Sequence, residues 1–247
     1  MRHDPAWKGA SDWRGTLGLL LPVAAIELSY ALVTRLLMPR YLSGISVELY
    51  ISVARLLTLP LYWKLYRPLI RSRAARLETL GKPSFLVGVV MLLSVPLLFG
   101  KDDWTDPVAR TVFVLTSLVV GLREEIVYRT IVQNLLEERL GKAVAILLAS
   151  VVFALYHYGY GGWSYSWPRF FELFLFGCIF GVMYRISGSL LLAATLHAMI
   201  DAVYAVSPLI PQPLPRADGL WAEALVLLVF WVWARRCADD GRRLGIG

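Results

Sequence analysis

Long apolar stretches recur along the whole chain, and they limit the fold more than any other feature. A helix that crosses the hydrocarbon core of a membrane needs about 20 largely apolar residues, and fewer where other helices surround it. Candidate spans lie at residues 16–38, 45–66, 84–100, 108–136, 143–160, 169–185, 189–207 and 220–235. No segment between them is long enough for a soluble domain. We therefore expect residues 1–247 to form a single integral-membrane domain, an all-α polytopic helical bundle of about eight transmembrane helices.

The composition excludes the ordinary soluble class. The chain is 57% hydrophobic and 17% charged, whereas soluble domains are about 45–50% apolar and about 25% charged. The net charge of +7 comes from bases that lie between apolar segments rather than along one amphipathic face. This pattern favours membrane lipids as the partner and argues against nucleic acid. Cys178 and Cys237 are far apart, so they indicate neither a disulfide framework nor a CxxC metal site.

Basic residues also predict the orientation, because loops facing the cytoplasm carry an excess of Lys and Arg. With the N-terminus inside, 16 of the 25 bases fall in the inner loops and termini and 4 in the outer loops, while the other 5 lie within spans. An odd number of spans would place one basic terminus outside. We expect both termini to be cytoplasmic, in a multi-pass protein of a prokaryotic cytoplasmic membrane.

The fourth span, 108–136, contains four charged residues near its middle: Arg123, Glu124, Glu125 and Arg129. Each charge at a bilayer centre costs about 2.5–3.5 kcal/mol, so these side chains should face the bundle interior. Glu125 and Arg129 are four residues apart and can form an ion pair on one helix face. Glu124 points about 100° away from Glu125 and lacks that partner. Alternatively, the helix ends at Arg123 and the charges lie among cytoplasmic headgroups.

Two of the three histidines lie in spans, and each alone has an ordinary explanation. His157 could belong to an interfacial aromatic belt, and His197 could be a buried residue bonded to Asp201, one turn further along. Spacing favours a single site instead. If the chain turns at Gly141, Glu124 lies 17 residues before the turn and His157 lies 16 after it. At about 1.5 Å per residue, the two side chains reach similar depths.

Asp201 reaches a comparable depth from the next inner turn, at Gly188, from which it is 13 residues away. His197 is 9 residues away and lies somewhat below it. A desolvated Glu beside a His can remove a proton from water. A second His, oriented by Asp201, can donate a hydrogen bond to the oxygen of an attacked carbonyl. These groups suffice to hydrolyse a peptide bond without a protein nucleophile.

The same four residues, Glu124, His157, His197 and Asp201, could instead hold a divalent metal such as zinc. Spacing alone does not decide between these two chemistries. No span contains a GxSxG serine motif or a HExxH zinc motif.

Three short motifs follow one another on successive spans: EEIVYR at 124–129, FALYH at 153–157 and HAMID at 197–201. In this the chain resembles the CPBP or Abi family of CAAX-processing and bacteriocin-processing intramembrane endopeptidases, related to the Ras-converting enzyme, whose signature is EExxxR, FxxxH and HxxxN or HxxxD. The motif-bearing core is about 108–207. Asp201 stands where many relatives carry Asn.

The resemblance implies a role for each motif residue. Glu124 and His157 would activate the water, and His197 and Asp201 would polarise or stabilise the scissile carbonyl oxygen. Arg129 would be structural and paired with Glu125. Phe153 would pack beside the site.

The resemblance implies an endopeptidase of the glutamate type that cleaves a membrane-anchored or C-terminal segment of a protein or peptide and requires no cofactor. A metal-dependent version of the same protease is one alternative. A proton-coupled transporter and a non-catalytic immunity or scaffold protein are others, although no inverted repeat supports transport. The oligomeric state is not indicated by the sequence.

Two further features concern packing. Glu27, Arg35, Glu48 and Arg55 lie in the first two spans. They either pair with each other across the bundle, which we expect, or extend their polar ends to the membrane interface. Gly177 and Gly181 form a small-xxx-small face suited to close helix packing.

Overall fold

The computed structural model describes residues 13–43, 45–71, 83–99, 107–157, 167–206, 220–229 and 231–232, and every regular element in these ranges is helical. The all-α prediction is confirmed for this part of the chain. The main helices are α1 (Trp13–Ala31), α2 (Ile45–Arg71), α4 (Pro83–Phe99), α5 (Pro107–Glu125), α6 (Asn134–Leu140), α7 (Lys142–Tyr156), α8 (Trp167–Ser187) and α9 (Leu190–Val206). A C-terminal helix covers Leu220–Val229.

Shorter helical segments continue two of these helices. The π-helical segment η2 (Leu32–Leu37) and the 3-10 turn η3 (Met38–Arg40) follow α1, and the π-helical segment η4 (Ile126–Gln133) joins α5 to α6. The chain is therefore helical without a break from residue 107 to residue 140. The alternative in which the helix ends at Arg123 is wrong.

Each of the expected spans coincides with a helix, although the ends of the third, fifth, seventh and eighth spans fall outside the described residues. Within the described ranges, the helices Trp13–Leu37 and Arg169–Ser187 are long and apolar enough to cross a membrane, and four other apolar helices are shorter. The number of spans and the cytoplasmic position of both termini therefore stay predictions.

Glycines make both of the inner turns that the depth argument uses. Gly141 has φ +77° between α6 and α7, and Gly188 has φ +63° between α8 and α9. Only glycine adopts such angles without a steric penalty. Each also caps the preceding helix. The Gly141 N–H donates to the Glu137 carbonyl at 3.1 Å, and the Gly188 N–H donates to the Tyr184 carbonyl at 2.9 Å. α7 and α9 thus start at the positions that the sequence predicts.

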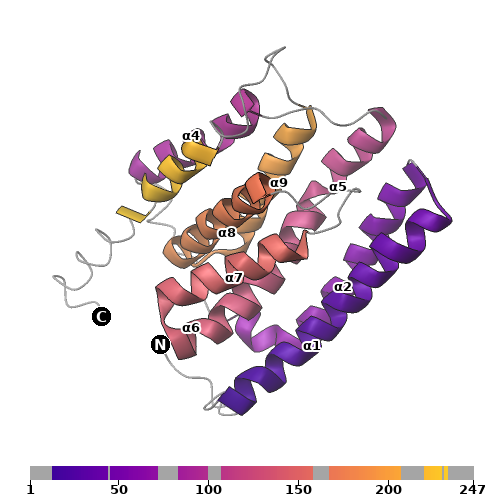
Figure 1. Cartoon of the computed structure of the whole chain (residues 1–247), viewed down its shortest axis with the longest axis horizontal. Coiled ribbons are helices and arrows are strands. Elements are labelled where there is room, and N and C mark those ends of the chain that lie inside the picture. Colours follow the sequence, from indigo (N-terminus) through magenta and orange to yellow (C-terminus); the bar gives the residue numbers. More distant parts are fainter. Residues whose placement is uncertain are drawn as a thin grey trace.

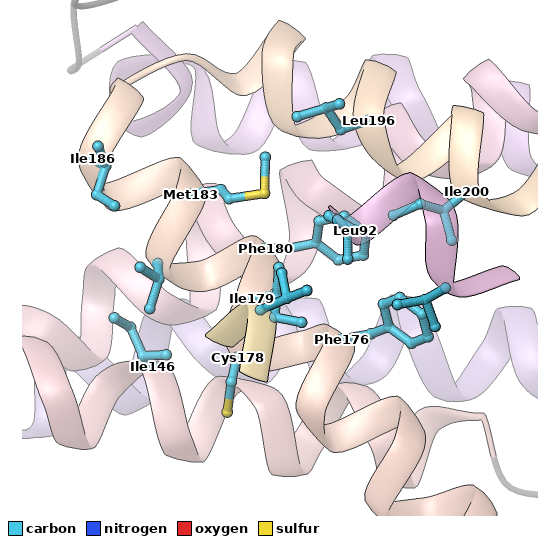
Figure 2. Packing of buried hydrophobic residues seen from close by; sticks show 13 residues of the cluster. Leu92, Ile146, Phe176, Cys178, Ile179, Phe180, Met183, Ile186, Leu196 and Ile200 are labelled. Carbon is cyan, nitrogen blue, oxygen red and sulfur yellow. The ribbon is translucent and has the colours of Figure 1, made fainter. Parts of the chain in front are cut away.

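Two apolar clusters hold the bundle together. The first, which we call the α8 cluster, gathers residues of α4, α7, α8, α9 and the C-terminal helix, among them Leu92, Phe176, Phe180, Met183 and Leu196. Figure 2 shows side chains of this cluster packed around α8. The second, the α5 cluster, includes Tyr62, Tyr128, Ile131 and Phe153 from α2, η4 and α7.

The helices are arranged with α8 between α7 and α9 (Figure 1), and α5 packs most extensively against α9. α1 and α2 form one flank of the bundle, linked by the hydrogen bond from the Tyr66 hydroxyl to the Leu19 carbonyl. Large apolar side chains cover the outside, with Leu28, Leu57 and Leu115 each more than 70% exposed. An apolar exterior around buried charges is the arrangement that a lipid environment requires.

Candidate active site

The charged residues of α5 and η4 face the interior, as the cost of membrane charges predicts. Arg123, Glu125 and Arg129 are fully buried, and Glu124 is 3% exposed. The continuous helix carries them past the middle of the bundle rather than to its surface. Their partners therefore come from neighbouring helices.

Glu125 holds two partners at once. Its Oε2 accepts a hydrogen bond from Arg129 Nε at 3.2 Å, so the expected ion pair on one helix is present. Its Oε1 lies 2.9 Å from His197 Nδ1, which donates to it from α9. The spacing of the motifs along the chain does not predict this second contact. Glu125 thereby fixes the orientation of the His197 ring and directs its Nε2 atom towards Glu124.

Glu124 faces both imidazoles. Its Oε2 atom lies 3.6 Å from His157 Nε2 and 3.8 Å from His197 Nε2. Among the described residues, no side chain donates a hydrogen bond to this oxygen. Both separations are longer than a direct hydrogen bond, and a single water molecule bridges groups at such distances.

His157 lies at the C-terminal end of α7. Its Nδ1 is 2.8 Å from the Phe153 carbonyl oxygen, one turn earlier in the same helix. A carbonyl can only accept, so Nδ1 carries a proton and the neutral ring presents an unprotonated Nε2 to Glu124. The FxxxH spacing thus sets the tautomer of the histidine as well as its position.

Aromatic rings fill the space around the two imidazoles. The Phe153 ring lies 4.6 Å from that of His157 and 6.0 Å from that of His197, between centroids. Phe180 of α8 stacks on His197 at 4.6 Å with an interplanar angle of 14°. Phe153 thus packs beside both histidines. Phe180 was missed, because a phenylalanine within an apolar span gives no signal of its own.

Asp201 lies one turn beyond His197 on α9, at the position that the spacing predicts, but it makes no direct hydrogen bond to His197. Its Oδ2 is 3.8 Å from His197 Nε2, too far for a hydrogen bond. Glu125 orients His197 instead, because α5 packs closely against α9. The Asp201 side chain is 23% exposed and that of His157 is 15% exposed, whereas Glu124 and His197 are at 4–5%. The site is therefore accessible from the side of Asp201 and His157.

A glycine explains the close packing of α5 on α9. A Cβ atom at Gly121 would lie 2.5 Å from the Ala194 carbonyl oxygen and 3.3 Å from His197 Cβ. The missing side chain lets α9 approach within reach of Glu125 and Glu124. Gly121 lies one turn before these carboxylates, so it sets the separation of the helices at the level of the site.

The metal-dependent alternative would use Glu124, His157, His197 and Asp201 as ligands. Within the described ranges, no group of three or more His, Cys, Asp or Glu side chains is arranged to hold a metal ion. The site presents a carboxylate, two imidazoles with defined hydrogen-bond partners and a second carboxylate at the more exposed end.

Comparison with known proteins gave one family match over the part of the chain that carries the site. Residues 107–203 match the family model described as type II CAAX prenyl endopeptidase Rce1-like. A search of curated proteins gave no match. The matched segment is about two-fifths of the chain and includes α5, α7, α8 and most of α9. Over this segment, which carries all seven motif residues discussed above, the chain is similar to the Rce1-like family of CAAX protease-type peptidases.

Proposed function

We propose that the protein is an intramembrane glutamate-type endopeptidase that hydrolyses a peptide bond in a membrane-anchored or C-terminal segment of a protein or peptide. The observation that carries this proposal is the position of Glu124 Oε2, which faces the Nε2 atoms of His157 and His197 inside the bundle. The Rce1-like match supports the same class of reaction.

The reaction begins with a water molecule between Glu124 and His157. The Glu124 carboxylate takes one proton from the water, and the oxygen attacks the carbonyl carbon of the scissile bond. His157 Nε2 accepts a hydrogen bond from the same water and keeps its oxygen directed at the substrate. The burial of Glu124 strengthens these interactions, because the local dielectric constant is low.

The tetrahedral intermediate carries its negative charge on the former carbonyl oxygen. His197 stabilises this charge through Nε2–H when the ring holds both protons, with Nδ1–H still donated to Glu125. The C–N bond then breaks, and the proton held by Glu124 passes to the leaving amine. The products are a new carboxylate and a new amine.

The test uses purified protein in liposomes and two synthetic peptides, one with a prenylated cysteine near its C-terminus and one without the prenyl group. Cleavage is followed by mass spectrometry. We expect Glu124→Gln and His157→Ala to lower kcat by about 10²–10⁴-fold, the usual contribution of a positioned acid or base. Glu138→Gln, an exposed carboxylate on α6, is the matched control and should retain activity.

Two outcomes would contradict the proposal. Cleavage that persists in Glu124→Gln would exclude the glutamate mechanism, and loss of cleavage with a chelator that is restored by zinc would favour the metal-dependent alternative. The natural substrate can be sought in membrane proteomes prepared with and without the gene. A substrate should change mass at a C-terminal or juxtamembrane peptide only where Glu124 is intact.

A further inference from the structure

Arg123, the residue before Glu124, joins four helices. Its guanidinium group is fully buried and has a polar partner on each of three other helices. These contacts are Nη2 to Glu27 Oε1 on α1 at 2.6 Å, Nε to Thr58 Oγ1 on α2 at 3.0 Å, and Nη1 to the Tyr156 hydroxyl on α7 at 3.2 Å. The expected pairing of Glu27 within the first two spans is therefore wrong, because its partner is on α5.

Further contacts enclose the Glu27–Arg123 ion pair. The Tyr62 hydroxyl donates a hydrogen bond to the same oxygen of Glu27. The Tyr30 ring centroid lies 3.9 Å from Arg123 Cζ, in cation–π contact. Loss of one charge from such a pair leaves the other without a partner of opposite charge, and burial limits its access to solvent. The pair therefore has one preferred geometry.

This network and the candidate active site use neighbouring residues of the same two helices. Arg123 precedes Glu124 on α5, and Tyr156 precedes His157 on α7. Consecutive helical residues differ by about 1.5 Å in height and about 100° in direction. A hydrogen bond from Arg123 to Tyr156 therefore sets the separation of α5 and α7 at the height where Glu124 faces His157.

We propose that Glu27 and Arg123 are positioning residues, through which α1 and α2 hold Glu124 and His157 at the distance needed to share one water. This inference rests on the proposed function. It extends the site to helices outside the matched segment 107–203. Neither residue contacts the reacting atoms, so each acts through its neighbours.

A second ion pair in the bundle provides a matched control. Glu137 on α6 forms an ion pair with Arg185 on α8, with 2.9 Å between Oε1 and Nε and both side chains less than 20% exposed. It lies 13 residues beyond Glu124 in the same continuous helix. Glu27→Gln and Glu137→Gln thus make the same chemical change in two interhelical pairs, one beside the site and one remote from it.

The experiment measures kcat, KM and thermal unfolding of both variants with the peptide that the wild-type protein cleaves. We expect Glu27→Gln to lower kcat by about 10-fold or more with KM within about twofold, because displaced reacting groups slow the chemical step. Glu137→Gln should keep the wild-type kcat. Should Glu27→Gln fail to fold, Tyr156→Phe removes only the contact to α7 and should lower kcat several-fold, about the coupling expected of a supporting residue.

Equal kcat losses in Glu27→Gln and Glu137→Gln would overturn the proposal, because they would indicate a general effect on stability. Wild-type kcat in both Glu27→Gln and Tyr156→Phe would overturn it as well. Glu124→Gln is measured alongside. If only Glu124→Gln is inactive, the hydrolase stands and the positioning role fails; if Glu124→Gln is active, the proposed function itself fails.

Discussion

Glu125 connects the structural and the chemical parts of the site through its two oxygen atoms. One oxygen accepts a hydrogen bond from Arg129 on its own helix, and the other accepts a hydrogen bond from His197 on α9. A carboxylate that served only as the partner of Arg129 would leave the imidazole free to rotate. The two glutamates of the EExxxR motif thus have different roles. Glu124 faces the two imidazoles, and Glu125 orients the ring of His197.

The structure predicts that the activity tolerates the substitution Asp201→Asn. The Asp201 Oδ2 makes no direct hydrogen bond to His197, being 3.8 Å from Nε2, so Asp201→Asn loses no such bond. The amide is neutral, has nearly the same shape and adds a donor for a carbonyl oxygen. We expect Asp201→Asn to retain kcat within about fivefold, whereas Asp201→Leu, which removes the polar group, should lose about 10²-fold or more.

Steady-state kinetics with the cleaved peptide decides between these outcomes. An inactive, folded Asp201→Asn protein would show that the negative charge itself is needed. That result would favour a role for Asp201 in charging His197 or in holding a cation.

The convergence of the site residues could be predicted from the sequence, but their pairing could not. Counting residues from Gly141 and Gly188 gives the depth of each site residue in the bundle. On this basis Glu124, His157 and His197 are expected at similar depths, and in the structure they lie together. Pairing depends on how far each helix is rotated about its axis and how closely it approaches its neighbour. The spacing from His197 to Asp201 therefore suggested a bond that Glu125 makes instead.

At the scale of whole helices, small residues determine which elements touch. A Cβ at Gly177 would lie 2.8 Å from Ser150 Cβ, and one at Gly181 would lie 2.9 Å from Gln133 Oε1. The close packing expected of the small-xxx-small face of α8 is thus present. A small-xxx-small spacing also joins Ser117 to Gly121 on α5, so the sequence carried a signal for close packing at Gly121. Only the structure shows that the α9 backbone lies against it.

Gly121→Ala should therefore damage the site without touching any of its polar groups. The added methyl group meets the Ala194 carbonyl oxygen at 2.5 Å, so α9 has to move away and carry His197 with it. We expect a loss of about 1–3 kcal/mol in the free energy of unfolding. A displacement near 1 Å should also lower kcat by about 10²-fold.

The matched control is Gly18→Ala on α1. No atom lies within 4 Å of a Cβ at Gly18, so this variant should keep its activity and gain up to about 1 kcal/mol from better helix propensity. Thermal unfolding in detergent and peptide cleavage are measured for both proteins. Equal activity of Gly121→Ala and wild type would show that the distance between α5 and α9 does not limit catalysis.

For the whole molecule, the all-helical class follows from the apolar stretches because a lipid environment leaves few alternatives. The long-range arrangement does not follow from them. Apolar helices of similar length can pack in many orders, and the sequence alone does not reveal that Glu27 of α1 contacts Arg123 of α5. The helices outside residues 107–203 are tied to the family segment by this polar network and by the α8 cluster.

The orientation of the bundle is a property of the whole chain, and the distribution of bases predicts it. The connection at 72–82 contains Arg73, Arg76 and Lys82, whereas the connection at 101–106 contains one base and three acids. The positive-inside rule places the first in the cytoplasm and the second outside. In a variant with Cys178→Ala and Cys237→Ser, a single cysteine is introduced at Lys82 or at Lys101. Whole cells are then treated with a membrane-impermeant maleimide.

We expect the Lys101→Cys protein to be labelled in intact cells and the Lys82→Cys protein only after the membrane is permeabilised. Tags at the two termini should both need permeabilisation for detection, since an even number of spans returns the chain to its starting side. Labelling of Lys82→Cys in intact cells would show that the bundle has the opposite orientation. The more exposed end of the site, with Asp201 and His157, lies at the C-terminal ends of α7 and α9, so the same measurement shows from which side water and substrate reach Glu124.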